Sequence, residues 1–203
     1  MVTFRDLQTP QQALDWTAQL NDKWPERIAV IDHIISLLQK LPFSDIHIVE
    51  LCPGVGTLAL ALLSAIPDLT YTGLDSSSVM VETATKQLQL YRPKAQVVET
   101  DLNQDAWLDV LPNQVQAIVS MQSLHDLGGE KEVDRIYRLA KTKLAPKGLF
   151  LNADLIVPEG IERANNPGRR SVSRHLNLIQ MHHYEQVSCT LQTGEFACIV
   201  GYA

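Results

Sequence analysis

The pattern that most constrains the fold is a regular alternation of short apolar runs with helical segments. The apolar runs cover residues 45–51, 69–74, 95–100, 115–121 and 149–156. Between them lie segments with apolar residues at helical spacing, such as 77–91 and 130–144. Strands that alternate with helices pair in parallel, because each crossover helix returns the chain to the same end of the sheet. The sequence therefore predicts an α/β fold with a doubly wound, mostly parallel sheet.

The two ends of the chain depart from this alternation. Residues 10–20 and 25–41 have helical periodicity, and Thr9 followed by Pro10 is typical of a helix start. At the other end, residues 186–191 and 196–202 are β-rich runs around a turn that contains Gly194, which indicates an antiparallel hairpin. We therefore expect seven strands ending in an antiparallel hairpin, with residues 1–44 as an N-terminal helical cover and 45–203 as a Rossmann-like domain.

Composition excludes several classes of function. The net charge is -6 and the sequence pI is about 5.5, which disfavours nucleic acid as a partner. Three cysteines at irregular spacing match no zinc or disulfide framework and indicate a reducing compartment, so we expect a cytoplasmic protein. The longest apolar stretch is about a dozen residues, too short to span a bilayer, and we expect no membrane association.

The most informative local motif is a glycine-rich turn after the first predicted strand. Gly54 and Gly56 allow positive φ and close approach of a ligand, and the helix that follows offers free N–H groups to a negatively charged group. The run from Gly54 to Ala59 also fits a relaxed dinucleotide fingerprint, and Asp75 follows at the required distance. A nicotinamide cofactor is therefore one interpretation of this turn.

Three further features favour a different cofactor. Glu50 stands directly before the turn, where its charge would repel a pyrophosphate but attract a zwitterionic amino-acid tail with a sulfonium. Asp75 and Asp101 end the next two strands, where carboxylates can accept ribose hydroxyls and an adenine amino group. The terminal hairpin is the third feature, since ordinary dinucleotide folds usually lack it.

In the order and spacing of these motifs, residues 45–202 resemble the class I S-adenosylmethionine-dependent methyltransferases. Glu50 to Gly56 is similar to the family's acid-x-Gly-x-Gly-x-Gly loop, with Cys52 in place of the first glycine. The resemblance implies S-adenosyl-L-methionine as the cofactor. It implies a cofactor site made of Glu50, Cys52, Gly54, Gly56, Asp75, Ser76, Asp101, Leu102, Ser120, Met121 and Gln122.

The segment after the fourth strand bears on the acceptor. It has no Asn-Pro-Pro-aromatic cluster and no Pro-Cys pair, which disfavours methylation of bases, and it lacks the acidic residue of metal-dependent relatives. We therefore expect no metal. Leu124-His125-Asp126 resembles the Leu-His-Asp of small-molecule O-methyltransferases, which implies His125 as general base and Asp126 as its partner. A His that only packs or contacts the cofactor remains the alternative.

Other residues are candidates for acceptor recognition. Trp16, Trp24 and Arg27 lie in the predicted N-terminal helices, which cover the active site in relatives. Arg170 and Arg174 belong to a basic segment after the fifth strand, which favours a small-molecule substrate that carries an anionic group. Core packing and a solvated helix face are the simpler explanations for these two sets.

Three functions are therefore compared. The first is methyl transfer to a small molecule, with O-methylation slightly favoured over N-methylation. The second is an NAD(P)-dependent oxidoreductase, which the fingerprint from Gly54 to Ala59 allows. The third is a non-catalytic module that binds S-adenosylmethionine or a partner protein, for which Cys52 in the glycine-rich loop is the main argument. The oligomeric state is not readable from the sequence.

Overall fold

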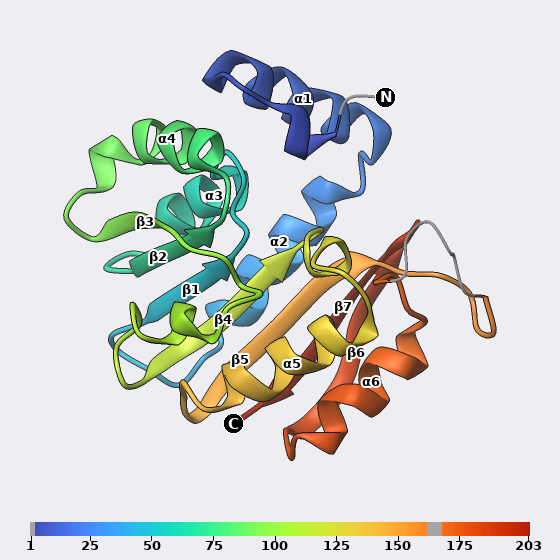
Figure 1. Ribbon diagram of the computed structural model, residues 1–203. Coiled ribbons are helices and arrows are strands. Elements are labelled where there is room, and N and C mark those ends of the chain that lie inside the picture. Colours follow the sequence, from blue (N-terminus) through green and yellow to red (C-terminus); the bar gives the residue numbers. More distant parts are fainter. Residues whose placement is uncertain (1–2, 162–167) are drawn as a thin grey trace.

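The computed structural model describes residues 3–161 and 168–203, which fold around one seven-stranded sheet (Figure 1). The strand order is β3-β2-β1-β4-β5-β7-β6. β1 to β5 pair in parallel, and β7 pairs antiparallel with both β5 and β6. The strands are β1 (His47–Leu51), β2 (Thr70–Asp75), β3 (Ala95–Glu99), β4 (Val115–Met121), β5 (Leu144–Leu155), β6 (Glu185–Thr193) and β7 (Phe196–Tyr202). The prediction of a mostly parallel, seven-stranded sheet that ends in an antiparallel hairpin is confirmed.

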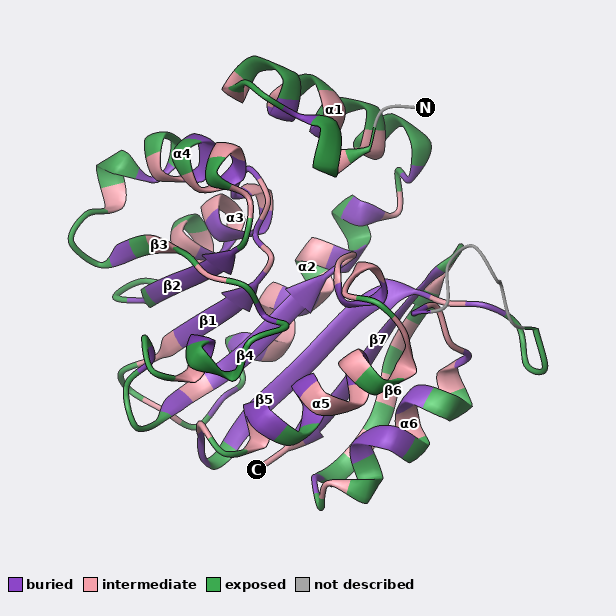
Figure 2. Cartoon of the chain, viewed as in Figure 1, coloured by how far each residue is buried: buried purple, intermediate pink, exposed green. Residues whose placement is uncertain are grey.

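Six α-helices of the described residues lie on the two faces of the sheet and at its upper edge. They are α1 (Pro10–Lys23), α2 (Arg27–Leu38), α3 (Thr57–Ala65), α4 (Ser78–Gln87), α5 (Glu130–Lys141) and α6 (Val172–Met181). Short 3₁₀ helices are η1 (Phe4–Asp6), η2 (Gln89–Tyr91), η3 (Asp105–Leu108) and η4 (Leu124–Asp126). Figure 2 shows the central strands buried along nearly their whole length, as expected for a parallel sheet covered on both faces.

Each face of the sheet has its own apolar core. On one face, Ile34 and Leu38 of α2 and Leu62 of α3 pack with sheet residues such as Ile48 and Leu151. On the other, α5 and α6 pack through residues such as Ile136 and Ile179. Helix α2 thus shares a core with the sheet, and the division of the chain at residue 44 stays a prediction.

Helix α1 is held differently from α2. Its start is the expected capping box, in which Thr9 Oγ1 accepts from the Gln12 N–H at 3.3 Å and Gln12 Oε1 accepts from the Thr9 N–H at 3.2 Å. A small apolar cluster that includes Leu7, Ala13 and Met80 joins the N-terminal segment to α4. The N-terminal segment therefore spans the upper edge of the sheet, resting on α4 at one side.

One strand differs from its expected bounds. The turn predicted at residues 146–148 lies inside β5, which begins at Leu144. The register between β4 and β5 shifts between Val115 and Ala117, and Lys147 takes a φ of 68°. Two steps along β4, from Val115 to Ala117, oppose five along β5, from Leu144 to Leu149, so β5 has three extra residues here. Extra residues in a paired strand are accommodated as a bulge, and the strand bends there instead of ending.

The topology positions a binding site. β1 lies between β2 and β4, so the chain leaves β1 toward one side of the sheet and later returns on the other side through β4. Open α/β sheets bind ligands at the carboxyl ends of strands where the winding direction reverses. The carboxyl ends of β1, β2 and β4 are therefore where a ligand site is expected.

Candidate functional site

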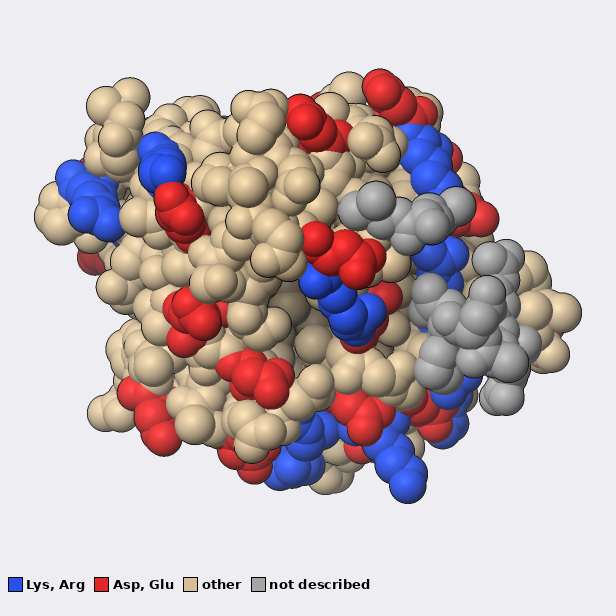
Figure 3. All heavy atoms as spheres, turned by 45° about the horizontal axis from the view of Figure 1, so that its top comes forward, with Lys and Arg blue, Asp and Glu red and all other residues tan. Residues whose placement is uncertain are grey.

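A cavity of about 550 Å³ lies at this edge of the sheet, a size suited to a small organic ligand. In Figure 3 the molecule is turned so that the top of Figure 1 comes toward the reader. This face is hollowed, and charged side chains surround the hollow. The strand wall of the cavity follows β1, β2 and β3 and includes Glu50, Cys52, Gly54, Asp75, Ser76, Asp101 and Leu102. The cover wall includes Phe4, Arg5, Leu7, Trp16, Leu20, Arg27, Met121, Gln122, Ser123, Asp126 and Leu127.

In the glycine-rich loop of the strand wall, every second residue from position 52 to 56 has a left-handed backbone conformation. Cys52, Gly54 and Gly56 have φ values of 56°, 57° and 87°. A Cβ on Gly54 would meet no atom within 4 Å, whereas a Cβ on Gly56 would lie 3.5 Å from the Cβ of Ala84. Gly54 therefore exposes its backbone to the cavity, whereas Gly56 is favoured by its positive φ, since a Cβ there would make only ordinary contact with α4. Cys52 keeps the backbone shape that glycine usually supplies at a cost of roughly 1–2 kcal/mol.

Asp75, the last residue of β2, is held by backbone N–H groups. Its Oδ2 accepts from the Gly54 N–H at 3.1 Å, and its Oδ1 accepts from the Ser77 N–H at 3.0 Å. Burial raises the pKa of this carboxyl, and the backbone N–H groups oppose the shift. A carboxylate has about four lone-pair sites, so Asp75 keeps acceptor capacity for ligand hydroxyls beside these backbone contacts.

Glu50 is 2% exposed and accepts a hydrogen bond from the Tyr71 hydroxyl at 2.7 Å. Burial raises its pKa to about 7, against the hydrogen bond from Tyr71, with a further rise from the charge of Asp75 and an opposing effect of Arg27. A carboxyl group with this pKa lacks a full counter-ion within the protein. A cationic ligand group in the cavity would stabilise its charged form.

Arg27 is the matching cation on the cover wall, and it is 6% exposed. Its Nε donates to Asn21 Oδ1 at 2.8 Å, and its Nη1 donates to Gln122 Oε1. Both partners are neutral amides, and burial lowers the pKa of the guanidinium while Glu50 opposes this. Because Arg27 has five donors, this contact set leaves donors for an anionic ligand group.

Most of the expected site residues lie in this one cavity. Glu50, Cys52, Gly54, Asp75, Ser76, Asp101, Leu102, Met121, Gln122, Trp16, Arg27 and Asp126 line it. Gly56 lies behind the loop, against α4. Ser120 is fully buried in β4, where its hydroxyl pairs with that of Ser123 at 2.8 Å. These two residues shape the cavity without lining it.

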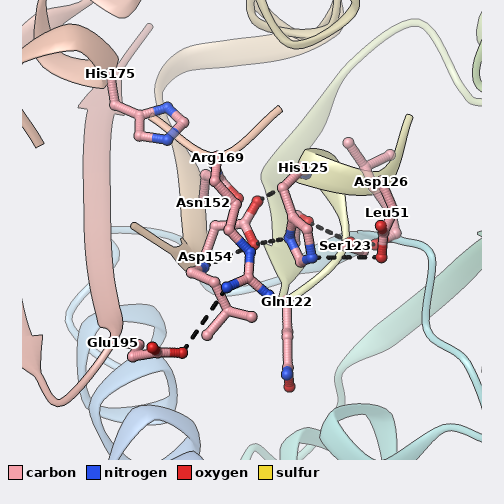
Figure 4. A network of polar contacts seen from close by, with 12 residues as sticks. Leu51, Gln122, Ser123, His125, Asp126, Asn152, Asp154, Arg169, His175 and Glu195 are labelled. Atoms are coloured by element: carbon pink, nitrogen blue, oxygen red, sulfur yellow. Dashed lines mark hydrogen bonds and ion pairs between the residues drawn. The ribbon is translucent and has the colours of Figure 1, made fainter. Parts of the chain in front are cut away.

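His125 does not line the cavity and is 5% exposed. Its Nδ1 lies 2.5 Å from Asp154 Oδ1, and its Nε2 lies 3.3 Å from Asp126 Oδ2 (Figure 4). Its backbone N–H donates to Asp154 Oδ2 at 3.0 Å. The imidazole therefore stands behind the cover wall, between two carboxylates.

The other three proposed acceptor residues lie elsewhere. The Trp24 Nε1–H donates to Glu195 Oε2 at 3.1 Å, and Trp24 belongs to the apolar core that α2 and α3 share with the sheet. Arg170 and Arg174 both form ion pairs with Glu130, at 3.1 and 2.5 Å. They line a separate shallow depression near the start of α6. Part of the basic segment that follows β5, residues 162–167, lies outside the described residues.

Sequence reasoning missed several residues of this region, of which Asp154, Tyr71 and Arg5 matter most. Asp154 lies near the carboxyl end of β5, so the signal that selected Asp75 and Asp101 was present there too. Tyr71 lies inside β2 and gives no signal that its hydroxyl reaches Glu50. Arg5 contacts the backbone oxygen of Asp126 at 2.9 Å across 121 residues, a contact that only the tertiary structure defines.

Within residues 3–161 and 168–203, no three His, Cys, Asp or Glu side chains are grouped as metal ligands. In the same part of the chain, no helix is both long and apolar enough to cross a bilayer. The expected absence of a metal and of membrane association stays a prediction.

About half of the chain, in its centre, matches a known protein family. Residues 48–148 match the family model described as "Methyltransferase domain". This segment contains the strand wall and the end of β4 that borders the cover wall. The match favours methyl transfer over the oxidoreductase. No curated protein sequence matches the chain.

Solved structures share the fold at low sequence identity. The structure of PigF with SAH is 17% identical and has a TM-score of 0.73, with 98% of this chain and 64% of that chain covered. The carbon methyltransferase CurJ is 16% identical with a TM-score of 0.71, covering 86% and 53%. An O-methyltransferase family 2 protein from Planctomyces limnophilus, in complex with apigenin, is 16% identical with a TM-score of 0.64, covering 77% and 50%. The chain thus spans about half to two thirds of the length of these proteins.

Proposed function

The chain belongs to the Rossmann-like, class I S-adenosylmethionine-dependent methyltransferases, and we propose that it methylates an oxygen atom of a small molecule. The observation that carries this proposal is the two-walled cavity. Its strand wall presents carboxylates for the cofactor, and its cover wall presents apolar and charged side chains for an acceptor. We place the enzyme in the cytoplasm, since its three cysteines are free thiols.

The strand wall fits S-adenosylmethionine in shape and in charge. Gly54 has open space where a side chain would stand, so a ligand can lie against the backbone of the loop. Asp75 offers two oxygens to a pair of ribose hydroxyls, and Asp101 and Leu102 lie next along the wall for adenine. When bound, the cofactor supplies an electrophilic methyl group on a sulfonium.

Glu50 and Arg27 suit the amino-acid tail of this cofactor. Both are buried at the cavity, they attract each other, and no ion pair joins them among the described residues. A zwitterion placed between them meets an anion at one end and a cation at the other. The guanidinium is therefore proposed to contact the cofactor carboxylate or an anionic acceptor, with Glu50 facing the ammonium.

The cover wall orients the acceptor and excludes water. Phe4, Trp16 and Leu127 give it an apolar surface, and Asp126 adds a carboxylate. Holding the acceptor oxygen in line with the methyl group accounts for much of the rate in such reactions. O-methylation is favoured because Leu124-His125-Asp126 places titratable groups beside this wall.

Thermal unfolding of the purified chain with S-adenosylmethionine, S-adenosylhomocysteine, NAD and NADP tests the cofactor. A ligand at about a hundred times its Kd stabilises by roughly 2.7 kcal/mol, which for a domain of this size is about 5–10 °C. We expect this shift with the two adenosyl compounds only. A shift with NAD or NADP alone would contradict the proposal.

Asp75→Ala tests the strand wall within the same assay. Each hydrogen bond to a charged group contributes about 1.5–3 kcal/mol, so the loss of both weakens S-adenosylhomocysteine binding by roughly a hundredfold or more. Glu99→Gln is the matched control, because Glu99 pairs with Asp75 in the sheet register but is exposed and outside the cavity. Its affinity is expected to equal that of the unaltered chain.

A panel of acceptors tests the rest of the proposal. Apigenin, catechol, phenol and 4-hydroxybenzoate offer hydroxyl groups, and 4-aminobenzoate offers an amine in a molecule shaped like 4-hydroxybenzoate. Methylation is followed by transfer of label from methyl-labelled S-adenosylmethionine. Faster methylation of 4-hydroxybenzoate than of 4-aminobenzoate and of phenol supports an oxygen acceptor with an anionic group, and the reverse order argues against it.

A further inference from the structure

The histidine that the sequence suggests as a base is enclosed by charged groups. Asp154 contacts its Nδ1 and its backbone N–H, and Asp126 stands at its Nε2 (Figure 4). Asp154 is 1% exposed and accepts a further hydrogen bond from its own neighbour, the Leu155 N–H, at 2.8 Å. Both ring nitrogens of His125 are thus directed at carboxylates and neither lines the cavity.

These carboxylates favour the protonated form of the ring. Burial alone would lower the pKa of His125, but the charge and hydrogen bond of Asp154 and the charge of Asp126 outweigh it and raise the pKa, with Arg169 acting in the opposite sense. The same contact holds the pKa of Asp154 below its ordinary value despite burial. A protonated imidazole donates from both nitrogens and has no lone pair with which to take a proton.

Asp126 stands on the cavity side of this arrangement. It lines the cover wall, and its side chain is 38% exposed, against 5% for His125. Its backbone oxygen accepts from Arg5 Nη2 at 2.9 Å, which ties η4 to the N-terminal segment of the same wall. The carboxylate of Asp126 therefore lies between the imidazole and the space available to an acceptor.

We propose that Asp126 takes the proton of the acceptor hydroxyl, and that His125 and Asp154 are positioning residues that hold the Asp126 carboxylate in place. This inference rests on the proposed methyl transfer and assigns its proton acceptor. It also limits the acceptor to groups that carry a removable proton on a heteroatom, such as a phenol or an enol. It reverses the roles that the motif alone suggests for His125 and Asp126.

The chemistry of the step is balanced with a carboxylate as acceptor. A lone pair of the hydroxyl oxygen forms the bond to the methyl carbon, and the carbon–sulfur bond breaks with its electron pair left on sulfur. The O–H bond breaks as its proton passes to Asp126, which becomes a neutral acid. A weak base suffices because the hydroxyl proton becomes strongly acidic as the oxygen gains its third bond.

Histidine NMR of the ligand-free chain tests the positioning part. The six histidines are labelled with ¹⁵N, and the signals of His125 are identified by their loss in His125→Gln. We expect both ring nitrogens of His125 to carry protons at about pH 7, where a histidine with the ordinary pKa of about 6.5 is mostly neutral. We expect Asp126→Asn to lower this pKa. A neutral His125 ring at that pH overturns the proposal, whether or not an acceptor has been found.

Methylation kinetics on the acceptor panel test the catalytic part. Asp126→Asn is expected to lower kcat by about a hundredfold or more, the usual contribution of a general base, with S-adenosylhomocysteine affinity unchanged. His125→Gln is expected to lower kcat by only about tenfold, and Asp126→Glu to retain part of the rate. Asp134→Asn, which alters the partly buried pair of Asp134 with His182 outside the cavity, is the control.

Equal or greater loss in His125→Gln than in Asp126→Asn would identify His125 as the base and overturn the proposal. If the unaltered chain does not bind S-adenosylhomocysteine, the proposed function itself is contradicted. Failure of the proposed function is thus distinguishable from failure of the assignment of Asp126.

Discussion

Among the described residues, three buried acidic side chains lie at or near the carboxyl ends of strands, and their surroundings differ in two ways. In the strand wall, Glu50 and Asp75 accept hydrogen bonds from a phenol and from backbone N–H groups, and burial raises the pKa of both. Behind the cover wall, Asp154 pairs with His125 and its pKa is lowered. The first two carboxylates remain available to a cationic or hydroxyl-bearing ligand, whereas the third is neutralised within the protein.

Asp154→Asn should cause the largest loss of unfolding free energy among the variants that test this comparison. Removing one partner of a buried ion pair costs about 3–5 kcal/mol of unfolding free energy. The raised pKa of His125 gives stability that is complete below its ordinary pKa and is lost as the pH rises through the folded value. Urea unfolding should therefore show the larger loss at about pH 6 and a smaller one at about pH 9.

The partly buried pair of His182 and Asp134 is the matched control for this experiment, because solvent reaches it more than the pair of His125 and Asp154. Its nitrogen–oxygen distance is 2.7 Å, but its side chains are 15% and 34% exposed. Pairs that solvent reaches contribute about 0–1 kcal/mol, so Asp134→Asn should change stability little at either pH. A similar loss in both variants would show that burial is not the cause.

Glu50→Gln is expected to act in the opposite direction on stability. Folding raises the pKa of Glu50 from 4.5 to about 7, and each pKa unit is worth about 1.4 kcal/mol. The folded chain therefore gives up as much as about 3 kcal/mol as the pH rises through that interval. Glutamine removes this cost, so the variant should be more stable at about pH 8 and unchanged at about pH 4.

The same variant should bind S-adenosylmethionine more weakly, because the neutral amide no longer attracts its cationic groups. Gain of stability together with loss of binding would mark Glu50 as a functional residue that strains the fold. Unaltered affinity in Glu50→Gln would contradict its proposed contact with the cofactor tail.

Cys52→Gly and Cys52→Ala test the backbone of the strand wall, and the expected difference in unfolding free energy is the smallest of these predictions. Both variants remove the thiol, but only glycine adopts the φ of 56° without strain. We expect Cys52→Gly to be more stable than Cys52→Ala by about 1 kcal/mol in urea unfolding. Equal stability of the two variants would show that this backbone conformation carries no cost.

The strand wall could be predicted from the sequence because its parts follow parallel strands. Successive parallel strands end at one edge of the sheet, so Glu50, Asp75 and Asp101 had to converge once the alternation was recognised. The cover wall lacked such a rule. Trp16 and Arg27 reach the cavity, but Trp24, three residues before Arg27, turns into the core and binds Glu195 of the terminal hairpin.

The sequence by itself determined the layer order of the fold, the terminal hairpin, the glycine-rich loop and the acids beside it, because these follow from local periodicity and strand polarity. Only the tertiary structure decided which ionisable groups face the cavity and which are paired inside. Asp126 and His125 are neighbours in sequence, yet one lines the cavity and the other is enclosed by Asp154 from β5. Burial and charge partners depend on packing between distant segments, and these set the chemistry of each group.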